Sequence, residues 1–354
     1  MITNQNLFHK SKTLPVDKFF EKALYDKNNG YYSTKLPFGG AGDFLTAPGI
    51  SSLFSEMIGI WLVSTWKNLG EPKKFNIVEL GPGNGNLTKI LIKVFRNFPE
   101  FNKAVNLFLY EKSKLLRNLQ KKNIKNTKIK WVKNFKNISG GPVIFFGNEF
   151  YDAIPIKQFF RKNKFIYEKN YSLNKNNKIV EIYKKASVNN IVNIKKYKTI
   201  RKLNFIEFPK LGLEELNKIV KKISKLDGGI LLIDYGYLKS LNKDTLQSVK
   251  HHKKNKLLDN IGDADITSLV NFELLNEYFI KNKLKVKNIV TQKFFLKKMG
   301  ILERANIISK KMSFSEKTDL YLRLKRLLDI KLMGELFKVI FAYKFKNDNF
   351  VGFK

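Results

Sequence analysis

The sequence predicts an α/β fold in which buried parallel strands alternate with amphipathic helices. Nearly continuous apolar runs occur at 75–80, 142–146 and 228–236, as expected of strands that are covered on both faces. Apolar residues recur at three- and four-residue spacing over 87–98 and 213–226, which indicates helices. A glycine-rich turn connects the first strand to its helix, so a ligand site is expected there.

Residues 75–98 form the stretch on which this prediction depends. The strand ends at Leu80, and Gly81, Gly83 and Gly85 follow at alternate positions before the helix begins. Glycine allows the backbone to approach a ligand closely, and the N–H groups of the helix N-terminus face that ligand. The alternative is a plain strand-to-helix turn without a ligand.

The spacing of the glycines limits the kind of ligand. A dinucleotide loop needs a third glycine at the sixth position, where Asn86 or Thr88 stands, and the phosphate loop ending in Gly-Lys-Ser/Thr is absent. The acid Glu79 at the strand end suits a ligand that lacks phosphate and carries a cationic amine, as S-adenosylmethionine does. The candidate cofactor residues here are Glu79, Gly81, Pro82, Gly83 and Gly85.

The N-terminal part is predicted to be helical, with a long glycine-rich loop. A helix is expected over 14–28 with Pro15 in its first turn, and another from Ser51 or Ser52 to Trp66. The loop at 30–51 contains five glycines and two prolines. We interpret it as a functional lid rather than a connector, and we count Asp43 and Thr46 among the cofactor-binding candidates.

Two further polar stretches follow predicted strands. Glu111 comes after the strand that ends at Tyr110, one strand–helix–strand step beyond the glycines, where an acid can accept both ribose hydroxyls. The alternative is an exposed glutamate among lysines. A short strand at 129–132 comes next, and after the strand at 142–146 come Asn148, Glu149 and Asp152, which could hold a cationic substrate. The alternative for these acids is a helix N-terminus.

The second half of the chain has a different pattern. Residues 156–208 are predicted to be an insertion of antiparallel strands with a turn at 174–178, and a candidate for partner binding. The α/β pattern then resumes, with a helix at 272–279, a strand at 286–291 and a last apolar segment, 332–345, that closes the sheet. His251 and His252 could suggest a metal, but adjacent residues of a strand point to opposite sides, so no metal is expected.

Composition excludes several classes of protein. The 354 residues contain no cysteine and no apolar run long enough to span a membrane, and the N-terminus lacks the features of a secretory or mitochondrial signal. A bacterial cytoplasmic protein is expected. The net charge of +37 would suggest nucleic acid, but 60 of the 67 basic residues are lysines, spread along the chain. We attribute them to A/T-rich codons and to solvated surface, and we do not expect nucleic acid as the partner.

Several collinear blocks then identify a resemblance. The chain resembles the MidA-type S-adenosylmethionine (SAM)-dependent methyltransferases, relatives of a mitochondrial complex I assembly factor. The matching blocks are GGAGDFLTAPGISSLFSEMIGIW (39–61), VELGPGNGNL (78–87), LYEKSKLLRNLQ (109–120), NEFYDAIPIKQF (148–159), GGILLIDYGY (228–237), DTLQSVKHHK (244–253), GDADITSLVNF (262–272) and TQKFFLKKMGI (291–301). One departure is Gly49, where the family usually has an acid.

The resemblance implies a class I, Rossmann-like methyltransferase fold with a mostly parallel seven-stranded sheet. The expected domains are an N-terminal cover at 1–70 and a methyltransferase domain at 71–354 that contains the 156–208 insertion. Eukaryotic relatives of the family are expected in the mitochondrial matrix.

The resemblance also implies SAM as the methyl donor and a protein arginine, such as one of a complex I subunit, as the substrate. Glu149 and Asp152 would then orient the guanidinium and Asn148 would help to position the donor, with His251 or His252 as a less favoured late proton acceptor. Two alternatives stay open, a non-catalytic assembly chaperone with this fold and an RNA methyltransferase. A homodimer also stays open.

Overall fold

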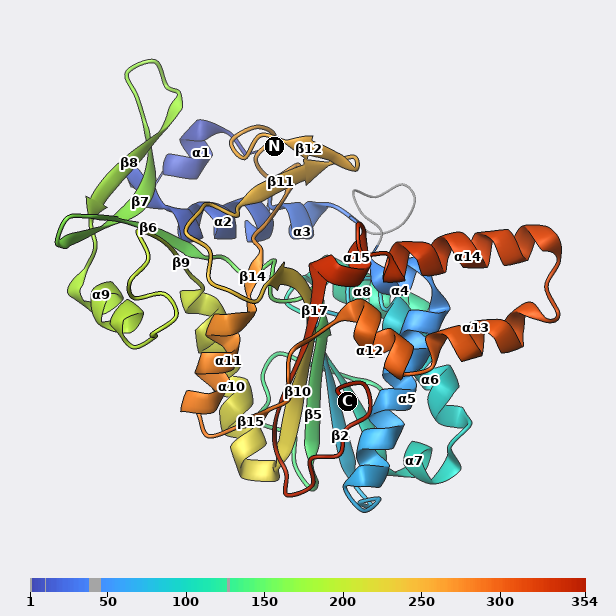
Figure 1. Ribbon diagram of the computed structural model, residues 1–354. Coiled ribbons are helices and arrows are strands. Elements are labelled where there is room, and N and C mark those ends of the chain that lie inside the picture. The colour runs from blue at the N-terminus through green and yellow to red at the C-terminus, as the bar shows by residue number, and fades with distance from the viewer. Residues whose placement is uncertain (1, 10, 38–45, 126–127) are drawn as a thin grey trace. The chain divides into compact units, whose positions relative to one another are not determined.

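The chain forms two compact units that interleave along the sequence. A computed structural model describes residues 2–9, 11–37, 46–125 and 128–354 (Figure 1). The first unit comprises Met1–Phe44, Tyr151–Asn217 and Tyr237–Tyr278, and the second comprises Leu45–Phe150, Lys218–Gly236 and Phe279–Lys354. Among the described residues, no helix is both long and apolar enough to cross a membrane.

The second unit is built on a mixed sheet. Its strands follow the order β15 (Lys285–Val286), β17 (Phe337–Lys344), β10 (Gly228–Tyr237), β5 (Val143–Asn148), β2 (Phe75–Leu80), β3 (Val105–Tyr110) and β4 (Lys130–Val132). From β10 to β4 all neighbours are parallel, whereas β17 is antiparallel to β10 and β15. The short strand β16 (Val290–Thr291) also pairs with β17. The predicted α/β class is confirmed.

Helices cover this sheet and bury its apolar side chains. Figure 1 shows α5 and α6 on one side of strands β2, β5 and β10. Trp61 of α5 is fully buried and meets Phe341 of β17 edge to face, with ring centroids 5.0 Å apart. The helices of this unit are α4 (Ala47–Ile50), α5 (Ser52–Asn68), α6 (Asn86–Arg96), α7 (Pro99–Ala104), α8 (Lys114–Asn123), α12 (Gln292–Lys298), α13 (Ile301–Ser309), α14 (Phe314–Leu328) and α15 (Met333–Leu336).

The first unit contains two antiparallel sheets. The larger has the order β1 (Thr13–Pro15), β7 (Phe165–Leu173), β6 (Lys157–Lys162) and β9 (Phe205–Phe208), with β8 (Ile179–Lys185) on β7. The smaller has the order β12 (Lys253–Asn255), β11 (Gln247–Lys250) and β13 (Asp265–Thr267). Its other elements are α1 (Asn4–Phe8), α2 (Val16–Tyr25), α3 (Tyr31–Thr34), α9 (Val188–Lys195) and β14 (Val270–Asn271), while α10 (Lys210–Leu226) and α11 (Phe272–Lys281) run into the second unit.

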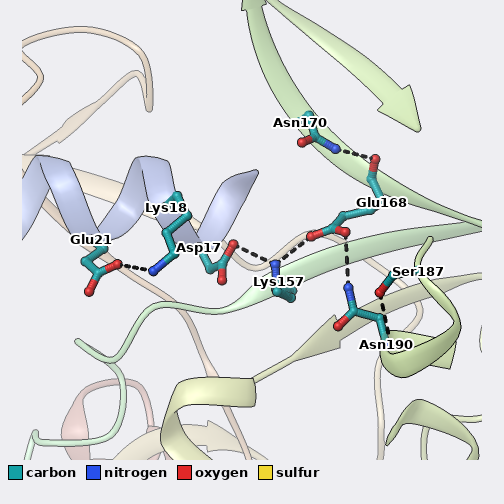
Figure 2. Close-up of polar contacts among 8 residues, drawn as sticks. All are labelled: Asp17, Lys18, Glu21, Lys157, Glu168, Asn170, Ser187 and Asn190. Atoms are coloured by element: carbon teal, nitrogen blue, oxygen red, sulfur yellow. Dashed lines mark hydrogen bonds and ion pairs between the residues drawn. The ribbon is translucent and has the colours of Figure 1, made fainter. Parts of the chain in front are cut away.

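A buried ion-pair network connects α2 to the larger sheet of the first unit. The Nζ atom of Lys157 lies 2.9 Å from Asp17 Oδ1 and 2.6 Å from Glu168 Oε1 (Figure 2). Asn190 Nδ2 donates to the other oxygen of Glu168 at 3.1 Å. Burial opposes the charge of Lys157, but Asp17 and Glu168 together raise its pKa, so the lysine stays protonated.

Most predicted elements are present, with corrected bounds. Ser51 caps α5 by accepting from Leu53 N, and the turn at 174–178 joins the antiparallel strands β7 and β8, both as predicted. The helix predicted at 14–28 starts later than expected, because Pro15 belongs to strand β1 and α2 begins at Val16. The predicted strand at 286–291 is split into β15 and β16.

The histidines were placed wrongly. His251 and His252 occupy the turn between β11 and β12, with φ angles of 49° and 60°, rather than alternate positions of a strand. Two consecutive left-handed residues are the geometry of a tight hairpin turn. The argument from strand alternation therefore does not apply to them.

Candidate cofactor-binding site

The glycine turn has the backbone conformation that the sequence predicts. Gly81, Gly83 and Gly85 have φ angles of 62°, 56° and 83°, a region that other residues adopt only at a cost. The N–H of Gly85 donates to Pro82 O at 2.8 Å, which closes the turn, and α6 begins at the next residue.

Packing adds a second reason for glycine at two of these positions. A Cβ atom on Gly85 would lie 2.7 Å from Ile124 Cδ1, and one on Gly81 would lie 3.0 Å from Phe150 Cδ2. The turn is therefore pressed against neighbouring side chains, and a bulkier residue would displace it.

Glu79 lies beneath the start of α6. Its side chain is 2% exposed, and the Thr88 hydroxyl donates to its Oε2. Burial raises the pKa of Glu79 to about 7, the bond from Thr88 offsets part of that rise, and the nearby charge of Glu111 adds to it. A contact between this carboxyl group and a ligand stays a prediction.

Glu111 follows β3, the strand beside β2. Its Oε1 accepts from Ser113 N at 2.8 Å, and its Oε2 accepts from Gln120 Nε2 at 3.3 Å. Burial raises the pKa of Glu111 to about 7, although both of these donors lower it. The residue as a whole is partly exposed.

Gln120 is the residue that sequence reasoning missed. It is fully buried on α8, and its Nε2 also donates to Gly83 O at 2.8 Å. Its Oε1 accepts from Trp131 Nε1 at 2.9 Å. One amide therefore holds the glycine turn, the acid after β3 and the strand β4 together. The only signal in the sequence is its place four residues after the buried Leu116 on α8.

The polar residues after β5 lie at the same edge of the sheet. Glu79 is opposite Phe146 of β5, and Ile233 of β10 is opposite Asn148, so the carboxyl ends of these strands are aligned. In such sheets this edge is where ligands bind. The structure thus places Glu79, Glu111 and Asn148 at neighbouring strand ends, as predicted.

Glu149 has an unusual backbone conformation. Its φ angle is 52°, which is uncommon for a residue with a long side chain and is often found at functional sites. Its Oε1 accepts from Asn148 Nδ2 at 3.0 Å and from Ala47 N at 3.3 Å. Asn148 Oδ1 is buried and has no hydrogen-bond partner among the described residues. A buried carbonyl oxygen of this kind needs a donor, which a ligand can supply.

The other predicted residues have separate surroundings. Thr46 immediately precedes α4 and does not cap it with its side chain, and Asp43 lies outside the described residues. Asp152 belongs to the first unit, where its side chain is 4% exposed and its backbone oxygen accepts from Ser268 N at 3.2 Å. No helix follows β5, so the alternative of a helix N-terminus at 149–152 is wrong. Within the described part of the chain, no three His, Cys, Asp or Glu residues are grouped so as to hold a metal ion.

Together, the parallel strands and the glycine turn at their carboxyl edge define a Rossmann-like ligand-binding protein. Residues 57–290 match the family model of S-adenosyl-L-methionine-dependent methyltransferases. The chain belongs to this family and is a SAM-dependent methyltransferase.

Individual relatives agree with this assignment. The mitochondrial protein arginine methyltransferase NDUFAF7 homolog of Caenorhabditis elegans is 30% identical over 78% of this chain and 70% of its own length. Human protein arginine methyltransferase NDUFAF7 is 26% identical over 94% of this chain and 81% of its own length. A crystal structure from Burkholderia thailandensis, bound to S-adenosyl-homocysteine, has the same fold. Its TM-score is 0.80 at 20% identity, over 96% of this chain and 90% of that one.

Proposed function

We propose that this methyltransferase acts on arginine side chains of a protein, such as a subunit of respiratory complex I. The observation that carries the proposal is the 30% identity to a relative named as a protein arginine methyltransferase. We further propose the class I architecture with a seven-stranded, mostly parallel sheet, an N-terminal cover at 1–70 and a methyltransferase domain at 71–354 with a partner-binding insertion at 156–208. A cytoplasmic location of this chain stays a prediction.

The residues at the strand ends fit the cofactor. The loop of Gly81, Pro82, Gly83 and Gly85 would hold its amino-acid part, and Glu111 would accept the ribose hydroxyls. Glu79, Thr46 and Asp43 are the further candidates. Two features support this fit: the buried Asn148 Oδ1 lacks a donor, and Glu79 and Glu111 have no ion-pair partner among the described residues. When bound, SAM supplies an electrophilic methyl group on a sulfonium.

Methyl transfer requires the protein mainly to position the arginine side chain and to place negative charge beside it. An arginine guanidinium stays protonated in proteins, so its attacking nitrogen must be freed of positive charge by neighbouring carboxylates. We assign this role to Glu149, with Asn148 fixing the Glu149 carboxylate through the 3.0 Å bond. The proton that leaves the nitrogen after transfer passes to this carboxylate. Asp152 is the second acidic candidate, three residues further along the chain.

Binding of the cofactor can be tested by calorimetry with a matched pair of glycine variants. Gly83→Val should abolish SAM binding, because valine is strained at this φ and fills the space of the ligand. Gly70→Val is the control, since Gly70 has a similar φ of 78° but lies in the turn after α5 with nothing within 4 Å. No heat with the wild-type protein, or equal heat with wild type and Gly83→Val, would overturn the proposed binding of SAM at this loop.

Catalysis is separated from a chaperone role by Glu149→Gln. This variant keeps the hydrogen bonds from Asn148 and Ala47 to Oε1 but loses the charge, so methyl transfer to arginine peptides should fall about a hundredfold. SAM binding should be nearly unchanged. If the variant restores assembly of the respiratory complex in cells that lack this protein, the chaperone is the correct function. If transfer requires intact RNA, an RNA methyltransferase is the correct function.

A further inference from the structure

Helices α13 and α14 form a hairpin in the second unit that exposes large apolar side chains. The two helices run alongside each other, and their connecting turn points away from the sheet of this unit (Figure 1). Phe314, at the start of α14, is 87% exposed, Tyr321 is 64% exposed and Leu322 is 57% exposed. Residues 291–354 lie beyond the family match, so that match assigns the hairpin no role.

These three side chains share the outer face of α14. Phe314 and Tyr321 are seven residues apart, and Leu322 is next to Tyr321, so all three project from the same half of the helix. The packing stripe is a different one: Leu320, Leu324 and Leu327 recur at four- and three-residue spacing, Leu327 is buried, and the other two pack against the core. The exposed residues are therefore not the packing face of α14, and no described part of the chain covers them.

Positive charges outnumber negative charges around the apolar side chains. Two acids lie near the hairpin tip: Glu316 completes a capping box with Ser313, and Asp319 pairs with Arg323 at 2.7 Å. The remaining cations have no ion-pair partner among the described residues, and all are exposed. They are Lys310, Lys311, Lys317, Lys325 and Arg326.

Polar contacts hold the hairpin in place on its own unit. Arg304 Nε lies 2.8 Å from Glu56 Oε2 on α5, and Arg323 Nη1 donates to Ile50 O at 2.8 Å. The capping box fixes the start of α14. Phe314 is thus presented from an ordered helix end rather than from a loose loop.

We propose that this hairpin docks on the anionic surface of a lipid membrane. Aromatic and aliphatic side chains on a cationic helix are the composition of elements that lie in the membrane interface. The apolar side chains stand out from a convex helix, and lipid can enclose such a shape without a matching pocket. A second copy of the chain would instead bring two positively charged faces together.

Vesicle sedimentation at physiological salt tests the proposal. The full-length protein is mixed with phosphatidylcholine vesicles that contain or lack phosphatidylglycerol. Any protein of net charge +37 is attracted to anionic lipid, so the decisive comparison keeps the charge constant. Replacing Phe314 and Tyr321 by serine together should lower the partition coefficient roughly tenfold or more, because their burial in the interface is lost. Val188→Ser is the control, since Val188 is 78% exposed on α9.

A second readout locates the hairpin in the lipid. Phe314→Trp should show stronger fluorescence quenching by brominated lipids than the wild-type protein, with methyl transfer unchanged. Equal partition of wild type and the double-serine variant would overturn the proposal, as would the absence of extra quenching. A dimer that dissociates on Phe314→Ser would also overturn it, because a second copy would then be the occupant of this face.

Discussion

Carboxylates in the two units differ in whether a lysine pairs with them. In the first unit, Asp17 and Glu168 share the ammonium group of Lys157 (Figure 2). In the second unit, Glu79 and Glu111 have no ion-pair partner among the described residues, and the pKa of each is raised to about 7 by burial. Buried acids with raised pKa values are typical of ligand sites, which agrees with the cofactor role that we propose for this pair.

Glu207 is an acid of the first unit that has no lysine partner among the described residues. Burial raises its pKa to about 6. Both of its oxygens accept hydrogen bonds, from the N–H and hydroxyl of Thr245 and from Gln158 Nε2. Neutral donors can therefore satisfy a buried acid, whereas Glu79 accepts a single side-chain bond, from Thr88. Glu79 therefore has fewer hydrogen-bond donors than Glu207.

The largest effect is expected at the paired site. Lys157→Met should lower the free energy of unfolding by about 3–5 kcal/mol, because it leaves Asp17 and Glu168 buried without a cation. The control Lys18→Met removes an exposed pair with Glu21 on the same helix, worth about 0–1 kcal/mol. Urea titration of both variants measures the difference. Equal midpoints would show that the Lys157 network contributes nothing beyond a surface pair.

Substitution of Glu111 should lower the affinity for SAM rather than the stability of the fold. Glu111→Gln should weaken SAM binding by about 2 kcal/mol, since a charged acceptor for the ribose becomes neutral, while the urea midpoint changes little. Glu100→Gln, which removes an exposed acid that pairs with Lys103, is the control. Calorimetry measures both dissociation constants. An unchanged constant for Glu111→Gln would remove the ribose role.

The two kinds of carboxylate should also respond oppositely to pH. Glu79 and Glu111 bind protons more tightly in the folded state than at their usual value of 4.5, so stability without ligand falls as pH rises from about 4.5 to 7. In the first unit, Lys250 and Lys35 overcome the effect of burial and lower the pKa of Asp263 to about 2. Its contribution is complete above its usual value of 3.8 and is lost as pH falls towards 2.

Unfolding midpoints are measured between pH 5 and 7.5 for wild type and Glu79→Gln. They give the slope of stability against pH for each protein. The variant should flatten it, because the amide cannot titrate and can still accept from Thr88. Identical slopes would mean that Glu79 is not the titrating group.

The smallest effect is expected at Gly49, where the family resemblance predicts an acid. Gly49→Glu adds a carboxylate in α4, and its Cβ would meet only Thr46 Oγ1, at 3.8 Å. The change should raise stability by about 0.5–1 kcal/mol, because glycine is a poor helix residue. SAM affinity, measured by calorimetry, should stay within about twofold of wild type. A large gain would show that the missing acid matters.

Local features of the site were predictable, and long-range ones were not. The strand, the three glycines and α6 follow one another in the chain, so periodicity and glycine spacing identified them. Glu111 could be found from its distance along the chain. Gln120 could not, because its partners Gly83 and Trp131 meet it only through the packing of α8.

The division into units has the same explanation. The pairing of Leu14 with Tyr171 brings β1 to the larger sheet of the first unit across more than 150 residues, and no local sequence pattern predicts it. The last strand, β17, was expected to close the sheet, and it lies antiparallel between β10 and β15. The left-handed turn of His251 and His252 was not predicted, because its residues are not the usual asparagine and glycine.

The bond from Trp131 to Gln120 connects one indole to the candidate cofactor site. The indole N–H ends a chain of contacts that starts at Gly83 and Glu111, whereas the other two tryptophans, Trp61 and Trp66, are buried in the apolar core. When the cofactor binds at the glycine turn, as we propose, the environment of one indole out of three should change. We therefore expect cofactor binding to alter the intrinsic fluorescence and Trp131→Phe to remove that change.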